Sequence, residues 1–176
     1  AINGDVTVKG LDMNSTQGDK AVVDVIKKFG ANVTILENAV RVQKSDLHGI
    51  EFDATDIPDM VPAIAVLASF ASGKTVIKGA QRLRYKESDR IESVVYNLKA
   101  LGVDVKETPD GMEIGGGRPL HSAKLKGYND HRIVMAFSVA AMNIGDCEID
   151  DAQSINKSYP SFFDDYNKLG GKADVL

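Results

Sequence analysis

The sequence contains a single cysteine, Cys147, among its 176 residues. One cysteine cannot form a disulfide within the chain, so a disulfide-stabilised scaffold is excluded and a reducing compartment is favoured. Cys147 lies in an alternating segment of an expected strand. There we expect a small buried apolar side chain rather than a nucleophile.

The sequence also lacks an excess of positive charge, long apolar runs and the spacing of metal ligands. With 25 acidic and 21 basic residues the formal net charge is -4, whereas nonspecific nucleic-acid binding needs a basic face. No apolar stretch reaches the roughly 18–20 residues of a membrane span, and no signal peptide is evident. No His, Cys or Asp spacing resembles a metal site. We therefore expect a cytoplasmic protein that binds no nucleic acid, membrane or metal.

One pattern recurs along the chain about every 70 residues, as in proteins built from repeated supersecondary units. The copies start near residues 4, 73 and 145, each with a short strand, a helical segment and a Leu-Gly or Phe-Gly step. An apolar helical segment precedes the second and third copies but not the first, and the third copy stops after one strand. We expect residues 1–176 to form a single domain that is part of a larger protein.

Hydrophobic periodicity predicts a mixed α/β (α+β) fold. Strands are expected over 5–9, 74–78 and 146–150, which alternate and are bounded by Gly or Asp. The segments 63–71 and 133–141 are apolar nearly all round and rich in Ala, so they are expected to be buried in the centre, with amphipathic helices outside. The glycine-rich residues 115–119 are expected to form a plain loop.

Two amphipathic helices have recognisable ends. Asp89 is a suitable N-cap, with Glu92 three residues later, and Gly102 ends that helix. We expect Asp19 to open an earlier helix in the same way, with Gly30 at its end.

Basic residues stand at the predicted starts of helices, where the helix dipole disfavours them. Lys86 and Arg90 flank one start, Arg132 lies in the first turn of another helix, and Lys157 precedes a third helix expected from about Pro160. Unpaired backbone N–H groups together with Lys or Arg form a site for phosphate or carboxylate. If the repeats bring these helix starts to one surface, the cations converge on one anion.

Local ion pairing is the alternative for these cations, with Lys86 bound to Glu87 or Arg90 bound to Asp89 on a solvated helix end. Recurrence of cations at equivalent places in the repeats favours the anion site. Glu87 lies between two cations that would hold it ionised, whereas burial would act in the opposite direction.

Candidate acid–base groups occur at the same helix starts. Asp56 and Asp59 precede an Ala-rich helix and either cap it or point at a substrate hydroxyl as a general base. His131, next to Arg132, is expected to be a structural hydrogen-bonding group more than a catalyst. The other two histidines lie in polar loops and are not candidates.

Five motifs follow one another along the whole chain. They are Asn-Ser-Thr-Gln-Gly-Asp (14–19), Asp-Ile-Pro-Asp (56–59), Arg-Tyr-Lys-Glu-Ser-Asp-Arg (84–90), Asn-Asp-His-Arg-Ile-Val-Met-Ala (129–136) and Ser-Ile-Asn-Lys-Ser-Tyr-Pro (154–160). In this order they resemble the 3-phosphoshikimate 1-carboxyvinyltransferase (EPSP synthase) family. The resemblance implies most of the C-terminal domain of a two-domain fold, an inside-out α/β barrel with β-α-β-α-β-β units around buried Ala-rich helices.

The resemblance also implies a reaction. Enzymes of this family transfer the enolpyruvyl group of phosphoenolpyruvate to the 5-hydroxyl of shikimate 3-phosphate, by addition and elimination, without a metal or redox cofactor. Arg90 and Arg132 resemble the arginines that bind phosphoenolpyruvate, with Lys157 beside them. Lys86 resembles a ligand of shikimate 3-phosphate.

The remaining motif residues imply acid–base roles. Asp59 resembles the carboxylate that contacts the ring hydroxyl of shikimate 3-phosphate and takes its proton. Glu87 resembles the acid–base group near the methylene carbon of phosphoenolpyruvate. Lys157 is a second candidate proton carrier. Asp130 and His131 are expected to orient Arg132 and to line the pocket.

The family's N-terminal-half domain, with its ligands for the shikimate phosphate, has no counterpart in this sequence. We therefore expect the chain alone to be monomeric and inactive, with weak binding of phosphoenolpyruvate or of its competitor glyphosate. Two alternatives are a UDP-N-acetylglucosamine enolpyruvyl transferase, whose reactive cysteine lies in a mobile loop, and a noncatalytic anion-binding scaffold module.

Overall fold

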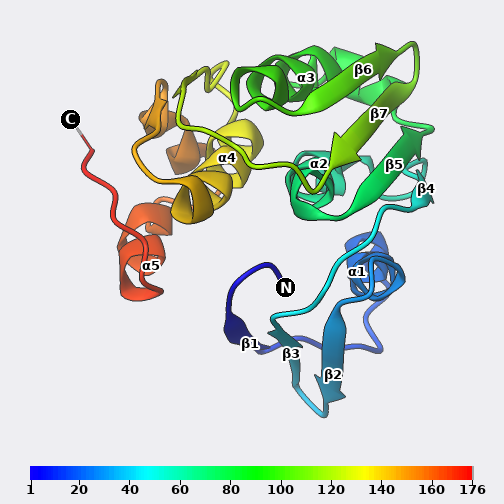
Figure 1. Ribbon diagram of the computed structural model, residues 1–176. Coiled ribbons are helices and arrows are strands. Elements are labelled where there is room, and N and C mark those ends of the chain that lie inside the picture. Colours follow the sequence, from blue (N-terminus) through cyan, green and yellow to red (C-terminus); the bar gives the residue numbers. More distant parts are fainter. Residues whose placement is uncertain (176) are drawn as a thin grey trace.

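Short strands and helices alternate along residues 1–175, which are the residues described by the computed structural model (Figure 1). The strands are β1 (Asp5–Lys9), β2 (Asn32–Leu36), β3 (Ala39–Gln43), β4 (Glu51–Asp53), β5 (Gly73–Lys78), β6 (Asp104–Thr108), β7 (Gly111–Gly116), β8 (Lys124–Leu125) and β9 (Glu148–Ile149). The α-helices are α1 (Val22–Lys28), α2 (Val61–Phe70), α3 (Arg90–Ala100), α4 (His131–Ile144) and α5 (Phe162–Lys168). Short 3-10 helices are η1 (Gly18–Ala21), η2 (Pro58–Met60), η3 (Gln81–Tyr85) and η4 (Ala152–Lys157). The predicted mixed α/β class is confirmed.

The two larger sheets share one topology. The first has the order β1-β3-β2 with antiparallel neighbours, and the second has the order β4-β5-β7-β6, in which β5, β7 and β6 are antiparallel. In the first sheet α1 separates β1 from the β2–β3 hairpin, and β3 pairs back to β1. In the second sheet α3 separates β5 from the β6–β7 hairpin, and β7 pairs back to β5; β4 is an additional strand. Parallel pairs join β4 to β5 and β8 to β9, with α2 and α4 as the respective crossovers.

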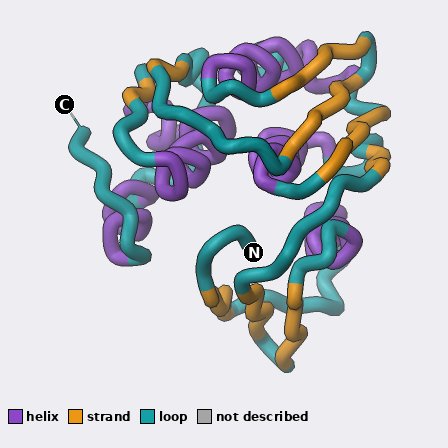
Figure 2. Tube along the Cα trace, in the orientation of Figure 1, coloured by secondary structure: helices purple, strands orange, loops and turns teal. Residues whose placement is uncertain are grey.

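The Ala-rich helices form the centre of the molecule, as their composition predicts. Helix α2 packs against α4, α3 and strands β5 and β7, and lies between the second sheet and α4 (Figure 2). Along α2, Ile64, Ala65 and Ala68 are inaccessible to solvent. The prediction of all-round burial is wrong for one side of α4, where Val139 and Met142 are exposed.

The ends of α3 follow their local signals. The Asp89 side chain accepts hydrogen bonds from the backbone N–H groups of Ile91 and Glu92, and Gly102 adopts φ +88° directly after the helix. Only residues without a Cβ take this conformation at little cost, which is why a glycine ends the helix.

Three expected boundaries are wrong. Asp19 lies in η1, and α1 begins at Val22 without a side-chain cap. The strand expected over 146–150 is reduced to β9, because it pairs only with the two-residue β8; Cys147 precedes it and is half-buried. The third helix begins at Phe162 rather than near Pro160.

The prediction of a plain loop over 115–119 is also wrong, because the first two glycines of this segment belong to β7. The end of this strand lies against the C-terminal end of α2. A Cβ at Gly116 would come within 2.1 Å of the Ala68 carbonyl oxygen and 2.4 Å of the Ala71 carbonyl oxygen. The glycine therefore permits strand and helix to touch through their backbones.

We predict that Gly116→Ala destabilises the protein by about 1–3 kcal/mol, the usual cost of overpacking a rigid site. Urea unfolding monitored by circular dichroism measures the change. The matched control is Gly115→Ala, whose added Cβ would have no neighbour nearer than 3.5 Å. Equal stability of the two variants would contradict the close packing of β7 against α2.

Candidate active site

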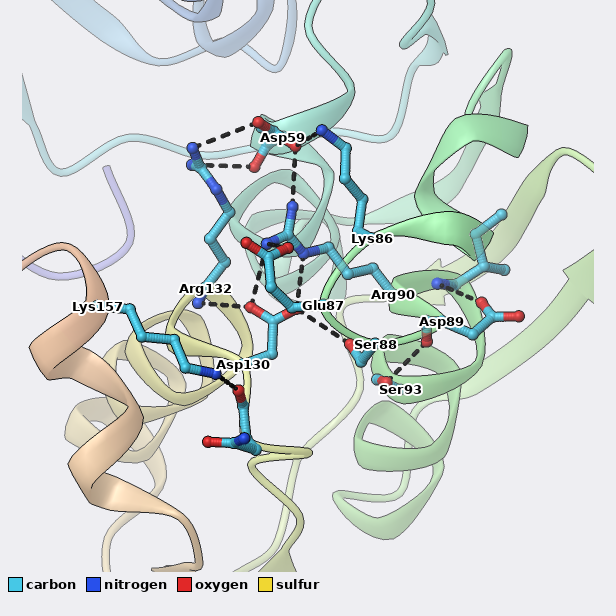
Figure 3. A network of polar contacts seen from close by, with 12 residues as sticks. Asp59, Lys86, Glu87, Ser88, Asp89, Arg90, Ser93, Asp130, Arg132 and Lys157 are labelled. Atoms are coloured by element: carbon cyan, nitrogen blue, oxygen red, sulfur yellow. Dashed lines mark hydrogen bonds and ion pairs between the residues drawn. The ribbon is translucent and has the colours of Figure 1, made fainter.

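Side chains from three helix starts meet at one place (Figure 3). Asp59 comes from η2, just before α2. Arg90 is the first residue of α3, and Lys86 and Glu87 lie in the segment that precedes it. Asp130 is the N-cap of α4, with Arg132 in the first turn. The convergence of cation-bearing helix starts that the sequence analysis expected is thus present for α3 and α4, where the start of α2 joins them through Asp59, but not for the third helix, α5.

Arg90 is the centre of this cluster, and its side chain is only 1% exposed. Its Nε donates to Asp130 Oδ2 at 2.8 Å and its Nη2 to Asp130 Oδ1 at 3.2 Å. Nη1 donates to Asp59 Oδ1 at 2.8 Å, and Nη2 also donates to Glu87 Oε2 at 2.7 Å. A buried guanidinium is tolerated only when carboxylates surround it in this way.

Asp130 holds the starts of α3 and α4 together. Besides both bonds from Arg90, its carboxylate accepts the Ser88 hydroxyl at 3.0 Å and the Arg132 backbone N–H at 2.9 Å. Burial by itself raises the pKa of Asp130, but the hydrogen bond and charge of Arg90, together with these two donors, outweigh it and lower the pKa below the ordinary value. Asp130 is therefore a buried, ionised carboxylate.

Asp59 is bound by three cations. Its Oδ1 lies 2.8 Å from Arg90 Nη1 and 3.2 Å from Lys86 Nζ, and its Oδ2 lies 3.4 Å from Arg132 Nη2. The capping alternative for Asp59 is wrong, because no side-chain cap bond is present at η2. Asp56 makes no hydrogen bond or ion pair with any residue in the described range 1–175.

The alternative prediction, that the cations pair with neighbouring carboxylates, is mostly wrong. Lys86 pairs with Asp59 rather than with Glu87, and Asp89 pairs with Arg84 rather than with Arg90. Among the ion pairs of Lys86, Arg90 and Arg132 with described residues, only the pair of Arg90 and Glu87 joins residues close in sequence.

His131 is buried beside these charges at the start of α4, and its Nδ1 has no hydrogen-bond partner among the described residues. Burial lowers the pKa of His131; Asp130 opposes this, and the charges of Arg132 and Arg90 add to it. The imidazole is therefore neutral near pH 7, which suits a structural group that can still exchange a hydrogen bond with a ligand.

Lys157 stands apart from the ion-paired cluster. It ends η4, five positions before α5 begins, so it does not lie at a helix start as expected. Its Nζ donates to the backbone carbonyl of Asn129, next to the N-cap of α4 (Figure 3). This bond brings Lys157 to the edge of the cluster without an ion pair to its carboxylates in the part of the chain that the structure describes.

Arg84 and Ser88 were missed by the sequence analysis. The Arg84 guanidinium binds Asp89 Oδ2 and Glu107 Oε1, each at 2.9 Å, and the carbonyls of Thr108 and Pro109 at 2.9 and 3.0 Å. It therefore ties the segment that carries Lys86 and Glu87 to the β6–β7 hairpin. No local signal reveals this, because the hairpin lies more than twenty positions away in the sequence.

A cavity of about 210 Å³ opens beside the cluster, between α2 and α4. Asp59 and Arg132 line one part of it, and apolar side chains such as Val66, Met135 and Phe162 line the rest. A larger cavity of about 530 Å³ lies between the end of α4, α5 and residues 170–175, and no residue of the ion-paired cluster lines it.

Two further findings concern the class of site. Across residues 1–175, no group of three or more His, Cys, Asp and Glu side chains is arranged to hold a metal ion. No helix in the same range has the length and apolar character to cross a membrane.

The family model of EPSP synthase (3-phosphoshikimate 1-carboxyvinyltransferase) matches residues 1–166. The chain belongs to the EPSP synthase family. It is 49% identical to the 3-phosphoshikimate 1-carboxyvinyltransferase of Methanothrix thermoacetophila over 172 residues, which is 97% of this chain and 40% of the relative. The enzyme of Methanococcus vannielii is 42% identical over 177 residues, 99% of this chain and 41% of the relative.

Solved structures agree with this assignment. EPSP synthase from Acinetobacter baumannii superposes with a TM-score of 0.85 and 29% identity, over 97% of this chain and 43% of that one. The enolpyruvyl transferase NikO from Streptomyces tendae has a TM-score of 0.78 at 20% identity, over 96% of this chain and 39% of that one, a likeness of fold alone. The chain thus spans about two fifths of the length of its EPSP synthase relatives.

The family resemblance inferred from the five motifs is therefore confirmed, and it favours EPSP synthase over the UDP-N-acetylglucosamine alternative. The roles of the individual residues stay predictions.

We predict that Asp130→Asn lowers the free energy of unfolding at pH 7 by about 3 kcal/mol, because a buried cation loses its charged partner. The folded-state pKa of Asp130 is depressed, so its contribution is complete above the ordinary Asp pKa of about 3.9 and is lost as pH falls through the folded value. Urea unfolding of both proteins from pH 7 to pH 2.5 measures this. The stability difference between them should shrink below about pH 4.

The control for this prediction is Asp104→Asn on β6, which changes an exposed carboxylate. That variant should keep nearly wild-type stability at every pH. A difference between wild type and Asp130→Asn that stays constant down to pH 2.5 would contradict an ionised Asp130.

We predict that Arg84→Met loosens residues 86–88 while the protein stays folded, because the side chain that joins them to the β6–β7 hairpin is gone. Backbone ¹⁵N heteronuclear NOE values at Lys86 and Glu87 should fall. Asp89→Asn should cause a smaller fall, because Asn still caps α3 but loses the ion pair. Arg82→Met, in the same 3-10 helix but exposed, is the control and should leave these values unchanged.

Proposed function

We propose that the chain contributes the phosphoenolpyruvate-binding and proton-transfer side chains of a 3-phosphoshikimate 1-carboxyvinyltransferase. Such an enzyme transfers the enolpyruvyl group of phosphoenolpyruvate to the 5-hydroxyl of shikimate 3-phosphate. The observation that carries the proposal is the meeting of Lys86 and Arg90, from the start of α3, with Arg132, from the start of α4, around Asp59. Membership of the EPSP synthase family supports the choice of reaction.

The donor is an anion with both a phosphate and a carboxylate, and the site offers what each requires. Arg90 and Arg132 present planar guanidinium groups, which bind such oxygens in pairs. Arg90 is held rigidly by Asp130, so its orientation is set before a ligand arrives. Lys157, at the edge of the cluster, adds a cation on the η4 side, and Lys86 faces the acceptor, shikimate 3-phosphate.

The acid–base chemistry falls to Asp59, Glu87 and Lys157. Asp59 takes the proton of the 5-hydroxyl as that oxygen bonds to C2 of phosphoenolpyruvate, while Glu87 exchanges a proton with the methylene carbon C3. Protonation at C3 makes C2 electrophilic, so a correctly placed acid lowers the barrier to addition directly. Loss of phosphate and of a C3 proton then yields the enolpyruvyl ether, with Lys157 as the second proton carrier.

Asp130 and His131 act on the geometry of the site. Asp130 binds the Arg90 side chain and the Arg132 backbone, and so orients both arginines. The expectation that Asp130 and His131 line the pocket is not met, because neither lines the cavity between α2 and α4; His131 instead keeps a buried imidazole nitrogen without a partner among the described residues.

The reaction also needs a second domain. The chain covers about two fifths of the relatives' length, and we propose that an N-terminal-half domain supplies the remaining ligands of shikimate 3-phosphate and closes over the donor, excluding water. The chain alone is then an inactive, cytoplasmic monomer that retains weak affinity for phosphoenolpyruvate and for the inhibitor glyphosate.

We predict saturable binding of phosphoenolpyruvate to the chain, detected as NMR shifts of the Glu87, Arg90 and Arg132 amides. Arg132→Gln should weaken the affinity about tenfold or more, because a charge-assisted hydrogen bond contributes about 1.5–3 kcal/mol. Arg118→Gln, in the exposed loop after β7, is the control and should bind like wild type. Shifts confined to other regions, or equal affinities of the two variants, would overturn the proposed donor site.

A further inference from the structure

The charges of the cluster balance. Three cations, Lys86, Arg90 and Arg132, are paired with three carboxylates, those of Asp59, Glu87 and Asp130. A polyvalent anion that entered this arrangement unchanged would leave it with a net negative charge. Binding of such a ligand is therefore more favourable when at least one carboxylate moves away from the cations.

The hydrogen-bond capacity of Arg90 leads to the same conclusion. A guanidinium has five N–H donors, and Arg90 uses its Nε donor, both Nη2 donors and one Nη1 donor on its three carboxylates. A single Nη1 donor remains. Paired binding of a phosphate or carboxylate to Arg90 is possible only after one of the present partners leaves.

Asp59 is the partner whose position coincides with an incoming anion. Its carboxylate touches Arg90, Lys86 and Arg132 at once, and its backbone carbonyl accepts Arg132 Nη1 at 3.4 Å. Every side-chain hydrogen bond of Arg132 to a described residue goes to Asp59. An anion that binds both arginines must occupy the space between them, where the Asp59 carboxylate now lies (Figure 3).

The other two carboxylates are less suited to this exchange, Asp130 because of its many hydrogen bonds and Glu87 because of its position. Asp130 is fully buried and accepts four hydrogen bonds, so its release would leave several donors unsatisfied. Glu87 is more exposed, at 41%, but it contacts Arg90 and not Arg132, so its departure would not open the space between the two arginines. Asp59 is 29% exposed, and its bonds to Arg132 are long at 3.4 Å, so it can turn toward water at a smaller cost than the fully buried Asp130.

We propose that the Asp59 carboxylate occupies the anion position between Arg90 and Arg132 in the unliganded protein, and that phosphoenolpyruvate binds by displacing it. This inference rests on the proposed donor site and adds a further role for Asp59. Displacement frees the carboxylate from its cations at the moment when the donor is bound. It can then accept a hydrogen bond from the acceptor hydroxyl, so donor binding prepares the base.

The test is calorimetric titration of phosphoenolpyruvate into wild type and Asp59→Asn at low ionic strength. We expect the variant to bind at least about fivefold more tightly, the lower end of ordinary coupling between two ligands of one site. Glu51→Gln removes one negative charge from an exposed pair with Lys78 and measures the general effect of net charge. Glu87→Gln removes a carboxylate that touches Arg90 alone, and should tighten binding less than Asp59→Asn.

A direct readout uses wild-type protein with ¹³C-labelled aspartate carboxyl groups. At saturation with phosphoenolpyruvate the Asp59 carboxyl signal should move, whereas the Asp130 signal should stay close to its starting position. This measurement does not depend on the folding of any variant.

The outcomes separate the two proposals. Equal affinity of wild type and Asp59→Asn, equal gains from Asp59→Asn and Glu87→Gln, or an unmoved Asp59 carboxyl signal at saturation would overturn the displacement while leaving the donor site intact. Absence of binding to both wild type and Asp59→Asn would overturn the donor site and the displacement together.

Discussion

The burial of the Arg90 guanidinium against the Asp130 carboxylate is the constraint on which the rest of the site depends. A charge without water is stable only when its partners are fixed around it, and these partners come from α3, α4 and the turn before α2. The starts of three helices are thereby held at one separation. Because the same carboxylate also caps α4 through the Arg132 amide, the network acts on backbone and side chains together.

This arrangement fixes the cations of the site, but their charges are already paired with carboxylates of the same chain. Cations at helix starts are unfavourable by themselves, and here carboxylates offset them in equal number. Under the proposed displacement, a ligand exchanges partners with a side chain rather than simply filling a basic pocket. Asp59 touches both arginines and is more exposed than Asp130. In the proposed mechanism it also takes the acceptor's proton, so ligand binding and acid–base chemistry would share one side chain.

Much of the fold follows from local signals, and its errors have physical causes. The Asp89 cap, the Gly102 terminus and the buried Ala-rich helices were predictable because each depends on neighbouring residues. Asp19 resembles Asp89 in sequence but caps no helix, because a 3-10 turn precedes α1. The length of β9 depends on the two-residue strand β8, which lies far away in the sequence. The need for glycine at the end of β7 depends on the carbonyl groups at the end of α2. Neither has a local signature.

The sequence by itself determined which cations, carboxylates and helix starts are available for the site. It also determined that they occur in an order that resembles one enzyme family. Only the tertiary structure decided the pairing. Lys86 binds Asp59 rather than its neighbour Glu87, Arg84 rather than Arg90 binds Asp89, and Lys157 lies at the edge of the cluster. The physical reason is that an ion pair is set by distance and burial, and both arise from packing between segments that the sequence keeps apart.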